Sequence, residues 1–203
     1  MKSGEINSLF KNLSKVIKNP RSDLKYKNKF TLLVSVVLSA QCTDVNVNNV
    51  TKNIYPKYNK PEHFIKLGRK KIEKLIKSIG LFRNKAKSVY LLSKQLIEKH
   101  NGKVPNNFEA LYALPGVGRK TASVVLNEGF GLPTIAVDTH VFRVSNRTGL
   151  APGKNPDEVQ KILYKVVPKK YLKKAGHTIL LHGRYTCKAR APSCKTCIII
   201  KYC

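Results

Sequence analysis

The sequence lacks any apolar run long enough to cross a bilayer. Its longest run, from Phe30 to Ala40, is much shorter than the roughly 20 residues that a membrane helix needs. The first residues, MKSGEINSLF, also lack the apolar stretch and small-residue cleavage site of a secretory signal. We therefore expect a cytoplasmic protein that neither spans a membrane nor is secreted.

The beginning of the chain is basic and amphipathic. Its apolar residues recur at helical spacing: Ile6, Leu9, Phe10, Leu13, Val16 and Ile17. An organelle transit peptide or a helix on a membrane surface would share these features. Glu5, Asp23 and the absence of Arg before Arg21 favour instead a helix that packs into the core.

Acidic residues are scarce. There are 11 Asp and Glu against 39 Lys and Arg, which gives a net charge of +28. A field of this sign attracts polyanions, so nucleic acid is the predicted partner and acidic lipid the second candidate. Because Lys, Asn and Ile have A/T-rich codons, part of the lysine excess can reflect genome composition. The charge therefore supports nucleic-acid binding without establishing it.

Strand-like alternation is almost absent, and only residues 134 to 144 are rich enough in β-branched side chains to suggest a strand. Other segments between Pro and Gly residues have helical periodicity, as in the stripe from Leu67 to Ile79. Asn155-Pro156 is a typical helix start. The sequence predicts an all-α protein of about ten short helices.

The five cysteines are unevenly placed. Four form the pattern C-x6-C-x2-C-x5-C at the end of the chain: Cys187, Cys194, Cys197 and Cys203. Disulfides would need an oxidising compartment, and structural zinc sites usually show two short Cys or His pairs. Four thiolates in one tight loop also suit a [4Fe–4S] cluster, which the spacing favours while leaving zinc open. Cys42 is predicted to be a buried thiol on a helix.

A glycine-rich turn separates two predicted helices in residues 106–129, NNFEALYALPGVGRKTASVVLNEG. Asn106 or Asn107 is expected to cap the first helix, which runs through Leu114. The second helix is expected to run from about Arg119 to Asn127.

Gly116 and Gly118 permit positive φ and a close approach of the backbone to a ligand. The first amides of a helix lack intrahelical partners and lie at the positive end of its dipole. Such a turn predicts an anion site suited to a DNA phosphate. A purely structural αα-hairpin is the simpler alternative for a G-x-G turn taken alone.

The string LPGVGRKTA resembles the helix-hairpin-helix of base-excision DNA glycosylases. Together with GFGLPTIAVDTHVFRVSNR (129–147) and the cysteine tail, it resembles the bacterial endonuclease III family. The resemblance extends through LLVSVVLSAQCTD (32–44) and LLHGRYTC (180–187). It implies the all-α, two-lobed helix-hairpin-helix glycosylase fold, and a [4Fe–4S] cluster held by the four cysteines named above.

The resemblance also implies two helical lobes. One spans 22–132 and contains the hairpin at about 106–129. The other combines 1–21 with 133–203 and carries the iron–sulfur loop, 187–203. DNA would lie across the cleft, with Lys120 and Asp138 on opposite walls.

In this family the lysine just after the hairpin is the nucleophile, and that position is Lys120 in this sequence. The aspartate of the VDTH segment is the second catalytic residue, here Asp138. An amine can attack C1′ of a damaged nucleotide, expel the base and form a Schiff base with the opened sugar. A carboxylate can stabilise positive charge on the sugar and help to move protons. Without this context Lys120 is a surface or phosphate-binding lysine, and Asp138 also has the position of a helix cap.

A damaged base must leave the stack to reach these groups, and side chains must fill the gap. Gln41 and Leu81 match the positions that the family uses for this, although a polar helix end and a loop leucine explain them without function. The predicted DNA contacts are Gln41, Leu81, Leu114, Gly116, Gly118, Arg119, Thr121 and His140.

The predicted function is removal of oxidised pyrimidines from double-stranded DNA by a monomer, followed by strand cleavage 3′ to the abasic site. Related adenine-specific glycosylases usually lack the lysine at position 120, so Lys120 favours this bifunctional enzyme. The alternatives are a monofunctional glycosylase for adenine or uracil, a non-catalytic iron–sulfur protein that senses redox state on DNA, and a general nucleic-acid chaperone.

Overall fold

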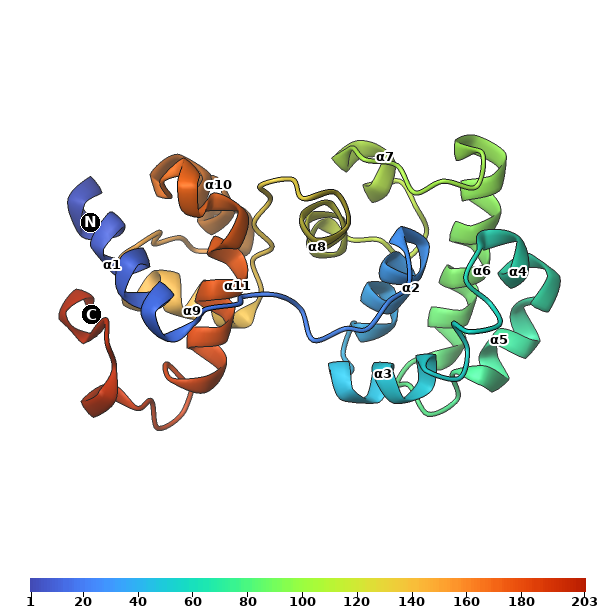
Figure 1. Ribbon diagram of the computed structural model, residues 1–203, viewed down its shortest axis with the longest axis horizontal. Coiled ribbons are helices and arrows are strands. Elements are labelled where there is room, and N and C mark those ends of the chain that lie inside the picture. The colour runs from blue at the N-terminus through green and yellow to red at the C-terminus, as the bar shows by residue number, and fades with distance from the viewer. The chain divides into compact units, whose positions relative to one another are not determined.

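The protein is all-α in a computed structural model that describes residues 1–203, and it contains no β-strand (Figure 1). The expectation of an all-α protein is confirmed. Residues 134–138, where a strand was conceivable, are irregular and lead into a helix. The α-helices are α1 Ser3–Val16, α2 Lys29–Ser39, α3 Asp44–Thr51, α4 Pro61–Leu67, α5 Arg69–Leu75, α6 Phe82–His100, α7 Phe108–Tyr112, α8 Arg119–Phe130, α9 Thr139–Arg147, α10 Pro156–Val166 and α11 Lys169–Tyr185; two 3-10 helices follow, Cys194–Thr196 and Ile200–Tyr202.

The chain divides into two compact units, each with its own hydrophobic core. The central unit comprises Asp23–Phe130. The terminal unit comprises Met1–Ser22 and Gly131–Cys203, so it contains both ends of the chain. None of the helices combines the length and apolar character that a membrane span requires.

Helix α2 forms the middle of the central unit, because every residue from Phe30 to Leu38 is buried. Such a helix is apolar on all sides and must be surrounded by others, here α3, α6 and α8. Its buried Ser35 hydroxyl lies 2.6 Å from the hydroxyl of Tyr55, which also donates to the Thr31 carbonyl at 3.1 Å. These bonds fix α2 within its core.

The apolar stripe predicted from Leu67 to Ile79 is interrupted. Gly68 has a φ of 73° and separates α4 from α5, so the stripe is not carried by one helix. Ile72 and Ile79 are buried as the periodicity predicts, whereas Leu75 is exposed. Helical periodicity places the apolar side chains but does not reveal a left-handed glycine within the repeat.

Helix α1 packs into the core of the terminal unit, as the sequence predicts, through Ile6, Leu9, Phe10 and Leu13. Asn155 caps α10 as expected, with its side chain accepting from the amide of Glu158. Helices α9 and α11 pack together at Gly183, where a Cβ would lie only 2.9 Å from the Cβ of His140. Glycine at this position therefore allows the close approach that brings α9 against α11.

Candidate active site

The hairpin of the central unit begins at Asn107, whose side chain accepts a hydrogen bond from the amide of Ala110 at 2.8 Å. Of the two candidate caps, Asn107 is therefore the one used. Helix α7 ends at Tyr112, earlier than predicted, because Leu114 already belongs to the turn. Leu114 is buried, so its side chain contributes to the core rather than to a surface.

The two glycines of the turn differ in what they do. Gly116 has a φ of 78°, and a Cβ there would lie 2.5 Å from the Cβ of Ser88. Gly118 has no left-handed φ, which corrects the expectation for this residue, and a Cβ there would meet nothing within 4 Å. Gly116 is thus required by the fold, whereas Gly118 leaves open space beside the backbone.

Helix α8 begins directly after this turn, since the amide of Ala122 donates to the carbonyl of Gly118 at 2.9 Å. Arg119, Lys120 and Thr121 consequently form its first turn, at the positive end of the helix dipole. Lys120 is exposed. The helix extends to Phe130, three residues beyond the predicted end at Asn127.

An aromatic pair on α7 lies beside the start of α8. The rings of Phe108 and Tyr112 are stacked with centroids 5.9 Å apart. The guanidinium of Arg119 lies 5.9 Å from the first ring and 5.7 Å from the second. These cation–π contacts restrict the side chain next to Lys120, and no sequence motif predicts them.

Gln41 and Leu81 share an uncommon backbone conformation. Both residues are exposed and left-handed, with φ of 53° and 58°. Their turns are neighbours, because a Cβ on Gly80 would lie 3.7 Å from the carbonyl oxygen of Gln41. The structure therefore brings together two residues that are 40 positions apart in the sequence. Each has a backbone conformation that is strained for any residue other than glycine.

The expectation that Cys42 is a buried thiol on a helix is wrong in both respects. This residue follows α2, which ends at Ser39, and it is only partly buried. Its Sγ lies 3.3 Å from Nδ2 of Asn46, and that amide also donates to the carbonyl of Ser78 at 3.1 Å. Cys42 thus belongs to the turn that carries Gln41.

In the terminal unit Asp138 is the N-cap of α9, which confirms that part of its prediction. Its Oδ1 accepts hydrogen bonds from the amides of His140 and Val141, both at 2.9 Å. The His140 ring is held in turn by Arg143, whose Nη2 lies 3.2 Å from Nδ1. The carboxylate is partly buried and has a defined orientation.

All five cysteines are free thiols, so the structure contains no disulfide. Burial raises the pKa of the Cys197 thiol, a backbone hydrogen bond from Ile199 lowers it, and charge on Cys187 and Cys194 raises it further. Burial also raises the pKa of Cys203, as do charges on the other three cysteines of the tail, against a lowering by Arg147. The four sulfur atoms of the tail are therefore within electrostatic range of one another.

The donor set of the tail fits an iron–sulfur cluster. Four cysteine sulfurs in one loop are a set that iron can bind as thiolates, with no other ligand type needed. His, Cys, Asp and Glu side chains form no group of three or more that could hold a metal ion as they stand. The fit therefore rests on donor chemistry, and the cysteines named in the sequence are the ones that would hold the group.

Two arginines on α9, missed by the sequence reasoning, bind the loop at Cys187. Arg147 donates through Nη1 to the Sγ of Cys187 at 3.5 Å and to the carbonyl of Lys188 at 2.8 Å. Arg143 donates through Nε to the carbonyl of Cys187 at 3.0 Å and through Nη2 to that of Gly183 at 2.8 Å. The spacing of four residues between these two arginines, which places them on one face of a helix, was the available signal.

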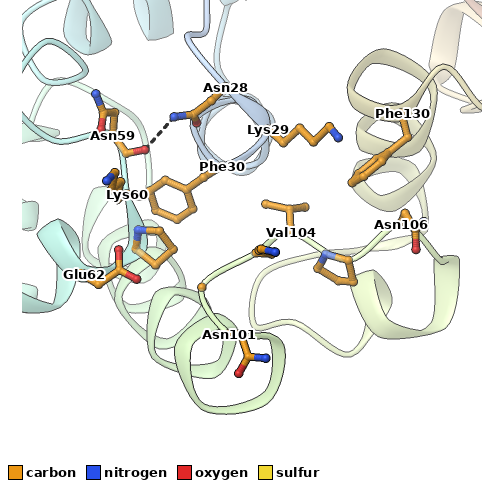
Figure 2. A pocket seen from close by; sticks show the side chains of 14 residues that line it. Asn28, Lys29, Phe30, Asn59, Lys60, Glu62, Asn101, Val104, Asn106 and Phe130 are labelled. Carbon is orange, nitrogen blue, oxygen red and sulfur yellow. Dashed lines mark hydrogen bonds between the residues drawn. The ribbon is translucent and has the colours of Figure 1, made fainter.

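A pocket of about 780 Å³ also lies in the central unit (Figure 2). Its walls include Phe30, Val104 and Phe130, with Nζ of Lys29 lying 4.3 Å from the centroid of the Phe130 ring. The pocket opens at the beginning of α2, whereas Gln41 follows the other end of this helix, about 16 Å away. None of the predicted site residues lines it.

Residues 34–169 match the model of the HhH-GPD superfamily base excision DNA repair proteins. The chain belongs to this superfamily. The match includes the hairpin, Lys120 and Asp138 and ends before the cysteine tail.

Similarity to curated relatives extends over the tail as well. The chain is 53% identical to endonuclease III of Rickettsia conorii over 203 residues, which covers 100% of this chain and 97% of the relative. It is 51% identical to endonuclease III of Escherichia coli K12 over 185 residues, 91% of this chain and 88% of the relative.

Solved structures have the same fold as this chain. A trapped endonuclease III–DNA covalent intermediate superposes with a TM-score of 0.94 at 43% identity, covering 100% of this chain and 96% of that one. A thermostable thymine-DNA glycosylase has a TM-score of 0.88 at 24% identity and shows the fold alone. This HhH-GPD protein is accordingly a DNA-binding base-excision repair glycosylase with AP-lyase activity.

Proposed function

We propose that this HhH-GPD glycosylase acts as a monomer on oxidised pyrimidines in double-stranded DNA, with Lys120 as the nucleophile. The observation that carries the proposal is the position of Lys120, exposed in the first turn of α8 directly after the Gly116 turn. A phosphate bound at that turn would bring a deoxyribose close to the amine. The names of the relatives and of the DNA complexes support the same activity.

The chemistry needs an uncharged amine. Its lone pair attacks C1′, the glycosidic bond breaks, and the base leaves with the bonding electrons. Loss of a proton from nitrogen and opening of the sugar ring give a Schiff base. Removal of a proton from C2′ then expels the 3′ phosphate with its oxygen, and water releases Lys120 from the cleaved sugar.

Asp138 has the electrostatic role in this proposal. Positive charge develops on the sugar as the base departs, and a carboxylate of fixed orientation stabilises it without having to reorganise. The two amide hydrogen bonds to Oδ1 supply that orientation. His140, held by Arg143, is proposed to contact a phosphate of the same strand.

Gln41 and Leu81 are proposed to occupy the space that the flipped nucleotide vacates. Exposed left-handed residues are costly, and such strain is concentrated at functional sites. Around the hairpin, the backbone of Leu114, Gly116 and Gly118 is proposed to grip the DNA phosphate.

The side chains of Arg119 and Thr121 are proposed to add further phosphate contacts at the start of α8. Arg119 is already held beside the aromatic pair on α7, so little of its side-chain freedom remains to be lost on binding.

The four cysteines of the tail are proposed to hold a [4Fe–4S] cluster with a structural role. Such a group would contribute folding energy to the 187–203 loop, which has little regular structure of its own. The loop also carries Lys188, Arg190 and Lys195, all exposed, which a folded loop would present to the phosphate backbone.

Borohydride trapping on a thymine-glycol duplex tests the proposal. The wild-type protein is expected to nick the strand and, under reduction, to become covalently attached to it. Lys120→Ala should form no adduct, whereas Lys161→Ala, an exposed lysine on α10, should behave as wild type. An adduct of Lys120→Ala at the wild-type level would show that the nucleophile is another residue. Base release without adduct or nick would indicate a monofunctional glycosylase.

A further inference from the structure

Lys85, in the first turns of α6, is one of the few buried charged groups of the molecule. It is only 6% exposed, and its Nζ donates to the carbonyl of Leu38 at 2.8 Å. Burial lowers the pKa of Lys85, opposed by negative charge on Cys42. Lysine is almost never buried to this extent unless a partner holds it, so the bond to Leu38 is what accounts for its position.

The bond replaces a backbone hydrogen bond at the end of α2. In a continued helix the Leu38 carbonyl would accept from the amide of Cys42, four residues later. That amide instead donates to Ser39 at 3.0 Å, and the ammonium of Lys85 takes its place at Leu38. The chain can then leave the helical path and enter the left-handed conformation at Gln41 without leaving a buried carbonyl unsatisfied.

The backbone of the same residue holds the second turn. The amide of Lys85 donates to the carbonyl of Leu81 at 3.0 Å, which is the first helical bond of α6 and anchors its left-handed N-cap. Lys85 is therefore hydrogen-bonded to both turns. Its side chain bonds to the Leu38 carbonyl, which precedes the turn of Gln41, and its main-chain amide bonds to the carbonyl of Leu81. The ammonium bond is charge-assisted and shielded from water, and so it is the stronger tie.

We propose that Lys85 is a positioning residue that holds the turns of Gln41 and Leu81 in the geometry needed to fill the gap left by a flipped nucleotide. The inference rests on the proposed role of those two residues. Lys85 acts through them and makes no contact with DNA itself.

Two substrates of the same lyase reaction should respond differently to the loss of the Lys85 ammonium. A duplex with one abasic site requires the gap to be filled, whereas a single strand with that abasic site contains no gap and needs only the amine. Lys85→Met keeps the aliphatic stem and removes the ammonium. Lys94→Met is the matched control, because Lys94 lies on the same helix, is exposed and is 3.7 Å from Glu98.

For Lys85→Met we expect kcat/KM on the duplex to fall about 10- to 100-fold, which is the effect expected from the loss of one charge-assisted hydrogen bond. Activity on the single strand should stay within about twofold of wild type. Lys94→Met should change neither value. A 2-aminopurine opposite the abasic site should brighten less on binding Lys85→Met, because an unfilled gap leaves that base more stacked.

A double-mutant cycle tests whether Lys85 acts through the plug residues. If it does, the double variant Gln41→Ala/Lys85→Met should lose much less duplex activity, expressed as a free energy, than the two single variants lose in sum. Lys85→Arg, which retains a cation and N–H donors, should recover part of the duplex activity. Should Lys85→Met be too unstable to purify, Lys85→Gln allows the same comparison.

Equal losses on both substrates, or no loss on either, would overturn the positioning role. Additive losses in the cycle would also overturn it. If Gln41→Ala and Leu81→Ala leave duplex nicking unchanged, the proposed plug function itself fails. If those two variants are impaired while Lys85→Met is not, only the role of Lys85 fails.

Discussion

The guanidinium of Arg147 donates to the sulfur of Cys187 at 3.5 Å. Arg147 is the last residue of α9, and Asp138 is the N-cap of that helix. One helix of nine residues therefore carries the proposed catalytic carboxylate at its beginning and holds the cysteine loop at its end. This arrangement ties the stability of the loop to the position of the carboxylate.

Arg147→Met should loosen the cysteine loop. The substitution removes the donor to Cys187 and to the carbonyls of Lys188 and Ala189, at a cost of about 1–3 kcal/mol for the groups left unsatisfied. Iron release to a chelator should be faster than in wild type. Arg190→Met, at an exposed loop position, should release iron at the wild-type rate. Similar iron-release rates for wild type, Arg147→Met and Arg190→Met would contradict the prediction that Arg147 holds the cysteine loop on α9.

Asp138→Asn and Asp138→Ala should separate the two roles of Asp138. Asparagine caps a helix about as well as aspartate, so the thermal stability of Asp138→Asn should be close to that of wild type. Alanine removes the cap and should cost about 1 kcal/mol. Both variants lack the charge, and base release should fall about 100-fold or more in each. Normal base release by Asp138→Asn would exclude the electrostatic role.

Gly116→Ala should mainly lower the stability of the protein, whereas Gly118→Ala should mainly weaken its binding to DNA. Alanine at 116 meets a φ of 78° and the Cβ of Ser88 at 2.5 Å, so we expect a loss of about 2–4 kcal/mol in urea unfolding. Alanine at 118 enters open space and should cost under about 1 kcal/mol. Its methyl group would stand where a phosphate approaches, so abasic-site affinity should fall. Unchanged affinity in Gly118→Ala would argue against phosphate binding at the turn.

Lys85 should affect stability in a pH-dependent manner. Burial lowers its pKa in the folded protein from 10.5, so on raising the pH the folded protein releases this proton before the unfolded chain does. The unfolded state then binds more protons, and the free energy of unfolding rises with pH. Relative to Lys85→Met, wild type should therefore gain stability as the pH is raised towards 10, as measured by urea unfolding at a series of pH values. The difference in the free energy of unfolding between wild type and Lys94→Met should not change with pH. If the Lys85→Met and Lys94→Met differences changed equally with pH, the predicted effect of Lys85 would be contradicted.

Several local features of the fold could be predicted because they depend on neighbouring residues. The amphipathic pattern of α1, the Asn155-Pro156 start of α10 and the capping by Asp138 all hold, since each is decided within one or two helical turns. The break at Gly68 and the early end of α7 were not foreseen. Helical periodicity continues through a left-handed glycine, and the end of a short helix depends on which side chain the core accepts.

The residue types of the candidate site were visible in the sequence, but their environments were not. Lys120, Asp138 and the four tail cysteines stand out by motif. The contacts of Arg119 with its aromatic pair, and of Arg147 with Cys187, join residues that no motif links. Lys85 appeared as one lysine among many, because a sequence records its charge but not its burial.

The helical class, the basic charge and the order of the chemical groups along the chain follow from composition and from spacing over a few residues, so they can be predicted without a structure. Which distant groups meet cannot be predicted in this way, because it depends on the packed core. The turns of Gln41 and Leu81 lie side by side because α2 and α6 pack together and a buried ammonium replaces one backbone bond. Such a contact depends on how whole helices pack, and that packing is settled by the complete core.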